Sequence, residues 1–325
     1  MSKSSYTLIL KGAAMGVAEV IPGVSGGTIA FITGIYERLI NCIKAFGPIA
    51  INGYREGGVK GFWKAIDGNF LVLLLSGMAV GFLIGIFAVS YLLEAYPEPL
   101  WAFFFGLIVA SAIYIGKQIS IWDFKKVLAL IIGIAIAYTI TVLSPAEGNL
   151  NPFYVFISGM IAISALLLPG ISGSFILLLM GMYTIIMPTI KHFLTHQDLA
   201  SLIIISIFAM GCLVGLVGFS RILSWLFDRY EELGFALLTG FLIGALNKVW
   251  PWRNVQQILN KDTGEILEVL DVANFKNLDM DRIKILYEVN VLPGDYMMDT
   301  PKVIASIIAL IAGFIIVFFF ETKSN

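Results

Sequence analysis

Ala18-Glu-Val-Ile-Pro-Gly-Val-Ser-Gly-Gly-Thr28 and Ala165-Leu-Leu-Leu-Pro-Gly-Ile-Ser-Gly-Ser-Phe175 each interrupt a long apolar run with the motif Pro-Gly-x-Ser-Gly. Proline removes a backbone donor and glycine permits a sharp reversal, so Pro22-Gly23 and Pro169-Gly170 predict two helix breaks. Irregular backbone at membrane depth survives only where protein or a wet cavity surrounds it. The two breaks are therefore expected to lie inside a protein core and to serve its function.

The composition places the chain in a membrane. Of its 325 residues, 58% are apolar and only 13% are charged, and the mean hydropathy is +0.90. Soluble domains are about 45–50% apolar and about 25% charged. The net charge of −1, with no basic stripe, argues against a nucleic-acid partner. No cofactor, no metal site and no catalytic residue is predicted.

Apolar runs of spanning length predict the transmembrane helices, since about 20 residues cross a bilayer. They lie at about 70–93, 99–116, 126–143, 199–226, 233–249 and 302–320. Two longer runs, about 6–46 and 153–190, contain the breaks. A helix from Tyr6 to Ile21 would be only about 24 Å long, short of the roughly 30 Å hydrocarbon core. Each broken run is therefore expected to form a re-entrant helical hairpin.

The two halves of the chain repeat one another. A shift of 147 positions aligns Gly12–Tyr36 with Gly159–Tyr183, a shift of 134 pairs Gly77 with Gly211, and a shift of 176 pairs Lys126 with Lys302. The increase from 134 to 176 locates an insertion of 42 residues, which is polar and acidic, within about 250–301. The expected domains are a first membrane repeat, 1–148, and a second, 149–325, which carries the insertion.

The predicted fold is an all-α polytopic membrane protein with inverted structural repeats. Each repeat has one re-entrant hairpin and three transmembrane helices, and three crossings turn the second repeat upside down, as in secondary transporters. Lysine and arginine favour cytoplasmic loops. Two loops on one side are basic, whereas the short loops around 94–98 and 144–152 contain neither residue type. We therefore expect both termini in the cytoplasm, the insertion outside, and a location in the inner (cytoplasmic) membrane.

The residues after each break are the candidate anion site. A helix that begins there presents free N–H groups, a dipole and hydroxyls to an anion. The expected phosphate-binding residues are Ser25, Gly26, Gly27 and Thr28 from the first hairpin and Ser172, Gly173 and Ser174 from the second. The alternative is that these small residues only allow close helix packing.

Glu19 is the candidate proton-coupling residue, because a carboxylate in an apolar run is costly and marks a site by default. It could instead cap the broken helix or pair with Lys11. Arg221 lies inside a span and suits a bidentate phosphate contact, although it could also reach the cytoplasmic face or pair with Asp228. Glu37 and Arg38 are read as an interfacial pair at the cytoplasmic end of the first hairpin.

The motifs resemble those of a bacterial and archaeal family of polyprenyl-phosphate (undecaprenyl phosphate) transporters, formerly a membrane domain of unknown function. The similarity covers nearly the whole chain, including Gly34-Ile-Tyr-Glu-Arg38 and Trp250-Pro-Trp252. The resemblance implies flipping of undecaprenyl phosphate, the carrier of cell-wall sugars, from the outer to the inner leaflet. Its partners would be that lipid and membrane lipids, and a homo-oligomer is left open.

Two other functions are kept as alternatives. The first motif is more distantly similar to that of membrane undecaprenyl-pyrophosphate phosphatases, which place a histidine just after the serines. Here Gly26-Gly27-Thr28 stands at that place and neither motif contains a histidine, so the residues favour a transporter over an enzyme. The third class is a small-anion channel or exchanger, in which the converging helix ends would bind a halide or a similar ion.

Overall fold

The computed structural model describes residues 3–20, 25–143, 146, 148–260, 265–269 and 282–321. Four helical segments among these residues are long and apolar enough to cross a membrane: Pro48–Ala95, Pro97–Gly116, Phe124–Val142 and Leu199–Ala245. The bent pair Gly173–Leu179 and Tyr183–Ile190 would add a fifth. The chain is thus a helical polytopic membrane protein, as its composition predicts.

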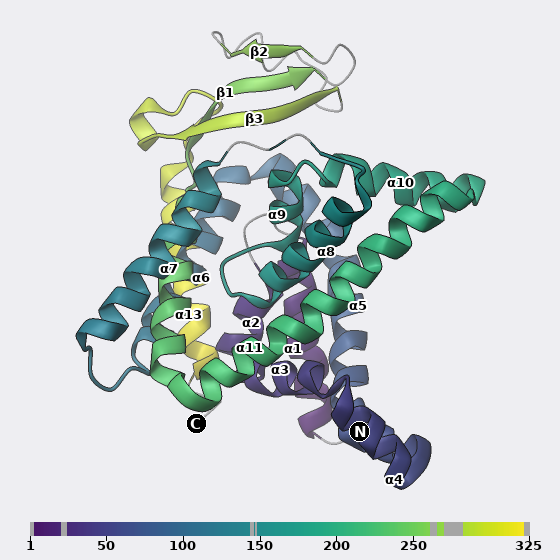
Figure 1. Ribbon diagram of the computed structural model, residues 1–325. Helices are drawn as coiled ribbons and strands as arrows, with labels where there is room; N and C mark the ends of the chain where they lie inside the picture. Colours follow the sequence, from purple (N-terminus) through teal and green to yellow (C-terminus); the bar gives the residue numbers. More distant parts are fainter. Residues whose placement is uncertain are drawn as a thin grey trace.

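The spanning helices follow the predicted runs closely. They are α5 (Gly68–Ala95), α6 (Pro97–Gly116), α7 (Phe124–Val142) and α11 (Leu199–Ala245), and the shorter apolar helix α13 (Val303–Glu321) coincides with the last predicted run. Two runs that the sequence separates, 199–226 and 233–249, join in α11, whose backbone leaves helical geometry at Tyr230. Figure 1 shows that α11 turns sharply along its length. Its two arms, before and after Tyr230, correspond to the two predicted runs.

Each interrupted run contains three shorter helices. The first has α1 (Lys3–Glu19), α2 (Gly26–Ile32) and α3 (Tyr36–Ala45), and the second has α8 (Pro152–Leu167), α9 (Gly173–Leu179) and α10 (Tyr183–His196). Pro22 and Gly23 lie outside the described residues. Gly34 and Gly181, which the 147-residue shift aligns, have φ of 68° and 67°. Glycine adopts this left-handed backbone at little energetic cost. Gly34 therefore lets the chain reverse between α2 and α3, and Gly181 lets it reverse between α9 and α10.

The same close contact recurs between two pairs of helices. In α1 against α5, a Cβ on Gly12 would collide with the carbonyl oxygen of Leu74. In α8 against α11, a Cβ on Gly159 would lie 2.5 Å from the carbonyl oxygen of Phe208. Glycine lets the paired backbones approach. The two glycines are related by the 147-residue shift and their partners by the 134-residue shift, so the sequence repeat is matched by a repeat in packing.

The last helices correct one of the predicted alignments. Gly106 of α6 contacts the Leu310 carbonyl of α13, and Gly240 of α11 contacts the Leu130 carbonyl of α7. The glycines differ by 134 positions, but their partners differ by 180. The shift of 176, which aligned Lys126 with Lys302, is therefore one helical turn short. Apolar helices of similar composition can be aligned in neighbouring registers, and only backbone contacts distinguish them.

The inserted segment, which its polarity predicts to be a partly folded loop, is folded in the part that the structure describes. It contains β1 (Arg253–Asn260), β2 (Ile266–Glu268) and β3 (Ile283–Asn290), which form an antiparallel sheet in the order β2-β1-β3, followed by the 3-10 turn η1 (Pro293–Asp295). Val255, Ile258 and Ile283 form its small core. The description of the chain as all-α is thus wrong for this segment, because its few apolar side chains gather on strands rather than on helices.

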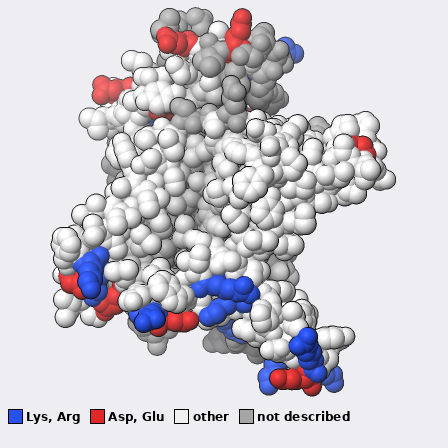
Figure 2. Space-filling view, in the orientation of Figure 1, with Lys and Arg blue, Asp and Glu red and all other residues white. Residues whose placement is uncertain are grey.

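The sheet lies at one end of the helical bundle, and α1 begins and α13 ends near the other end, the base of the molecule (Figure 1). On the visible face, lysine and arginine gather at the base (Figure 2). Buried Glu98, at the start of α6, attaches the sheet segment to the helices. Its carboxylate accepts hydrogen bonds from Tyr296 Oη (2.9 Å) and Lys302 Nζ (3.1 Å). The base, where basic and acidic side chains gather, and the sheet thus mark opposite ends of the bundle (Figure 2).

Candidate functional site

The two interrupted segments meet, as the sequence predicts. Ser25 Oγ donates a hydrogen bond to the Leu166 carbonyl oxygen at 3.1 Å. In the other direction, the Gly170 amide donates to Thr28 Oγ1 at 3.0 Å. The hydroxyl of Tyr36 also reaches the second segment, at the Leu167 carbonyl oxygen, 2.8 Å away. These bonds join residues more than 130 positions apart and satisfy backbone groups that the breaks leave without helical partners.

The hydroxyls of the first motif are used within the protein. Ser25 and Thr28 have no exposed surface. Ser25 is the N-cap of α2, and its Oγ accepts from the Gly27 amide at 3.0 Å. Gly26 and Gly27 are buried as well. The first half of the candidate site is thus closed in this conformation, and an anion could reach it only after these contacts open.

The second motif is more accessible. Ser172 is the N-cap residue of α9 and is buried, as are Pro169, Gly170 and Gly173, but Ser174 is exposed. The two serine hydroxyl oxygens lie 2.8 Å apart and share a hydrogen bond. The second half of the candidate site therefore pairs a buried hydroxyl with an exposed one.

Glu19 occupies the N-terminus of α2. Its Oε1 accepts a hydrogen bond from the Gly26 amide at 2.7 Å, the position at which the sequence predicts a phosphate. Lys11, from the same helix as Glu19, donates instead to the Thr33 carbonyl at the other end of α2. α1 thus places an anion at the start and a cation at the end of α2, which complements the helix dipole at both ends.

Arg221 lies beside Gly47, in a cavity whose lining includes no residue of the two motifs. Its guanidinium is close to the Gly47 backbone, 2.6 Å from where a Cβ on that glycine would stand. It lines a cavity of about 640 Å³ together with Lys44, Pro48, Ile49, Trp225, Asp228 and Arg229. Asp228 is 3.4 Å from Lys44. The expected grouping of Arg221 with the serines of the two motifs is thus not the grouping in this conformation.

Arg38, which the sequence groups with Glu37 as an interfacial pair, forms its ion pair with another residue in the structure. Arg38 pairs with Asp67, with Arg38 Nη2 2.7 Å from Asp67 Oδ2, and the guanidinium stands over the Phe70 ring. Both residues begin α3, and adjacent residues of a helix do not face each other. Arg38 therefore connects α3 to the start of α5.

Lys248 is a residue near the second motif that the sequence does not single out. Its Nζ lies 5.0 Å from the centroid of the Phe175 ring, next to Ser174 in the second motif. Its carboxylate neighbour, Glu288 of β3, is 3.8 Å away and makes a closer bond of 2.8 Å with Arg253. A cation thus stands over the ring of Phe175, the residue that follows Ser174 in α9. Its position in the turn after α11, at the end of an apolar run, gives no signal in the sequence that would connect it with the second motif.

Two interrupted helical segments that hydrogen-bond to each other inside a polytopic helical bundle are typical of membrane transporters. The chain belongs to the undecaprenyl phosphate translocase-like family, whose model matches residues 15–267. It is similar to a polyprenyl-phosphate transporter of Vibrio cholerae, with 44% identity over 263 residues, 80% of this chain and 82% of the relative. A polyprenyl-phosphate transporter of Staphylococcus aureus is 34% identical over 265 residues, 77% of this chain and 88% of that protein. No solved structure matches.

Proposed function

We propose that this chain is a polyprenyl-phosphate transporter of the cytoplasmic membrane that returns undecaprenyl phosphate from the outer to the inner leaflet. Membership of the translocase-like family and the names of two relatives support the substrate class. The direction is inferred from the resemblance in the sequence. The prenyl tail would remain in lipid while the single phosphate crosses through the protein.

The observation that carries the mechanism is the bond between Glu19 Oε1 and the Gly26 amide. A carboxylate and a phosphate oxygen are both anionic acceptors that suit a helix N-terminus. In our proposal, Glu19 holds the donors of α2 when no substrate is bound. The arriving phosphate displaces it, and the displaced carboxylate takes up a proton. Transport of the phosphate would then be coupled to the movement of a proton, because the phosphate and the Glu19 carboxylate compete for the same amide donors of α2.

The phosphate would pass between the two motifs. Ser172, Gly173 and Ser174 receive it first, because Ser174 is exposed whereas Ser25 and Thr28 are not. Opening the bonds between Ser25 and Leu166 and between Thr28 and Gly170 would then admit it to the first motif. Lys248, beside Phe175, would contact the phosphate at entry. Arg221 would act at exit, near the base.

The two membrane repeats, 1–148 and 149–325, would be inverted relative to one another and would rock about the joined breaks. The recurring glycine contacts of α1 with α5 and of α8 with α11 support a structural repeat. The three crossings per repeat that the sequence predicts would produce the inversion. The lysine and arginine residues at the base in Figure 2, which stand among acidic ones, support cytoplasmic termini with the sheet outside, because lysine and arginine favour the cytoplasmic side.

The proposal is tested with purified protein in liposomes that contain labelled polyprenyl phosphate. We expect the label to move between leaflets, faster with a pH gradient than without one, and no inorganic phosphate to be released. Phosphate release from polyprenyl diphosphate would support the enzyme instead. Ion current without lipid movement would support the channel, and either result would overturn the proposal.

A further inference from the structure

The segment between α3 and α5 forms a helical hairpin that stands away from the bundle. It is α4 (Pro48–Ala65), whose backbone leaves helical geometry at Gly57 and Gly58, where φ of Gly58 is +58°. The two arms touch at Gly53 and Gly61, whose backbones are too close to admit a Cβ on either. Figure 1 shows α4 projecting from the base. The proposed transport assigns no role to it.

The surface of this hairpin is both apolar and basic. Val59 and Trp63 are 72% and 42% exposed, and Ile49, Ile51 and Tyr54 are exposed as well. Arg55, Lys60 and Lys64 lie on the same element with one acidic residue, Glu56. Exposed apolar and aromatic side chains beside cations are typical of helices that lie in a membrane interface.

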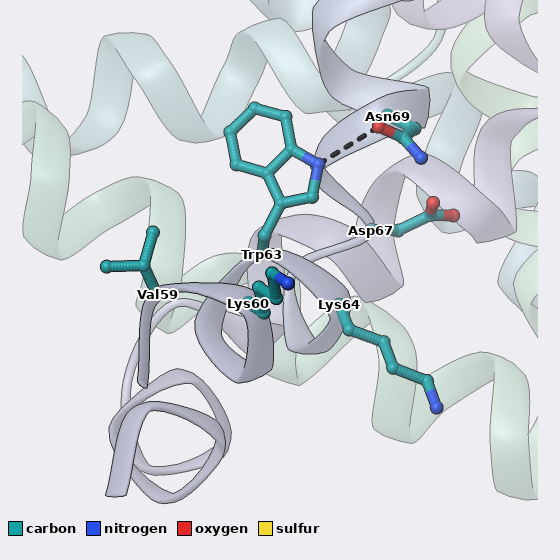
Figure 3. A pocket seen from close by; sticks show the side chains of 7 residues that line it. Val59, Lys60, Trp63, Lys64, Asp67 and Asn69 are labelled. Atoms are coloured by element: carbon teal, nitrogen blue, oxygen red, sulfur yellow. Dashed lines mark hydrogen bonds between the residues drawn. The ribbon is translucent and has the colours of Figure 1, made fainter. Parts of the chain in front are cut away.

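A cavity of about 350 Å³ opens where α4 meets α5 (Figure 3), lined by Val59, Lys60, Trp63, Lys64, Asp67, Gly68 and Asn69. Trp63 forms one wall. Its Nε1 donates to Asn69 Oδ1 at 3.0 Å, and its ring lies against Gly68, where a Cβ would be 2.4 Å from ring carbons. The indole is thus held in place.

The charges around this cavity favour an anion. Asp67 is already paired with Arg38. Lys60 and Lys64 make no ion pair with any residue that the structure describes. They are four residues apart and so lie on one side of the helix. Two uncompensated ammonium groups beside an indole suit a phosphate-bearing headgroup at the edge of a bilayer.

We propose that α4 lies on the cytoplasmic membrane surface and binds anionic phospholipid, with Lys60 and Lys64 contacting headgroup phosphates and Trp63 and Val59 entering the interface. The inference rests on the orientation in the proposed function, with the base in the cytoplasm. It does not depend on the transported substrate. The cytoplasmic leaflet is the anionic one, and each nearby lysine contributes about 1 kcal/mol, about a fivefold change in affinity.

The test measures the fluorescence of Trp63 in the full chain, as wild type minus Trp63→Phe, in vesicles with brominated lipids. We expect stronger quenching when phosphatidylglycerol replaces phosphatidylcholine. Lys60→Gln/Lys64→Gln should remove that increase, because about a twenty-five-fold loss of affinity follows from two charges. The matched control is Lys125→Gln, which replaces an exposed lysine at the start of α7. Its Trp63 fluorescence should be quenched to the same extent as in the wild type.

Equal quenching of Trp63 in both kinds of vesicle would overturn the proposal. The proposal would also be overturned if glycerol phosphate at modest concentration abolished the stronger quenching in phosphatidylglycerol vesicles. The cavity would then be a site for a soluble anion. Lipid flipping measured on the same vesicles reports the proposed transport separately. A protein that does not flip lipid but shows headgroup-dependent quenching would contradict the transport and leave the role of α4 standing.

Discussion

Replacing Glu19 by glutamine tests the proposed competition between this side chain and the lipid phosphate. The Gly26 amide now donates to Oε1 of Glu19 at 2.7 Å. A hydrogen bond to a charged group contributes about 1.5–3 kcal/mol and a neutral one about 0.5–1.5 kcal/mol. With glutamine at position 19, breaking the hydrogen bond from the Gly26 amide should cost about 1–1.5 kcal/mol less. Phosphate that takes over this amide should therefore bind about five- to tenfold more tightly.

Tighter binding should accompany loss of transport. In the proposed cycle the carboxylate must return to α2 to release the phosphate, and a neutral glutamine can neither compete for the donors as strongly nor carry a proton. We expect Glu19→Gln to fold and insert normally, to bind a short-chain prenyl phosphate more tightly by calorimetry, and to flip no lipid with or without a pH gradient.

The matched control is Glu94→Gln, which removes an exposed carboxylate at the end of α5. It should bind and flip lipid like wild type. The reasoning would be refuted by a Glu19→Gln protein with wild-type affinity, wild-type flipping and an unchanged response to the gradient. Glu19 would then be only the cap of α2.

Three further outcomes are expected. Thr28→Val should lower the free energy of unfolding by about 1–3 kcal/mol, because the buried Gly170 amide loses its acceptor; Thr28→Ser, which keeps a hydroxyl, should lose less in denaturant titrations. Lys248→Gln should raise the lipid concentration at half-maximal flipping with little change in the maximal rate, and the reverse pattern would exclude it from entry. Hydrogen bonds from the Ser201 amide and hydroxyl and from His192 lower the pKa of Asp198 from 3.8 to about 2. This cap of α11 is therefore fully effective above pH 3.8 and lost as pH falls through about 2, so the difference in melting temperature between wild type and Asp198→Ala should vanish over that range.

Much of the fold could be read from the sequence because the bilayer imposes simple constraints. Spanning helices need about 20 apolar residues, and those runs coincide with α5, α6, α7, α11 and α13. The aligned glycines Gly34 and Gly181 both turned out to be left-handed. Glycines are informative here since a membrane helix has few other ways to bring two backbones together.

The partners of charged residues could not be predicted in the same way. Arg38 meets Asp67, 29 positions away, and Lys44 bonds to Ser224 Oγ at 2.7 Å, 180 positions away. Such contacts depend on which helices become neighbours. The inserted sheet was missed for a related reason: short strands with a small core have weaker patterns than spanning helices.

The sequence by itself determined that this chain crosses a membrane, that Pro169-Gly170 interrupts a helix, and that hydroxyls and glycines follow at Ser25 and Ser172. Those conclusions rest on local properties, namely hydropathy, backbone freedom and spacing. Only the tertiary structure decided what the breaks do to each other. It brought Thr28 to the Gly170 amide and the Glu19 carboxylate to the N-terminus of α2. A free amide in a low-dielectric core must find an acceptor. Which acceptor is nearest depends on the packing of helices that are distant in sequence.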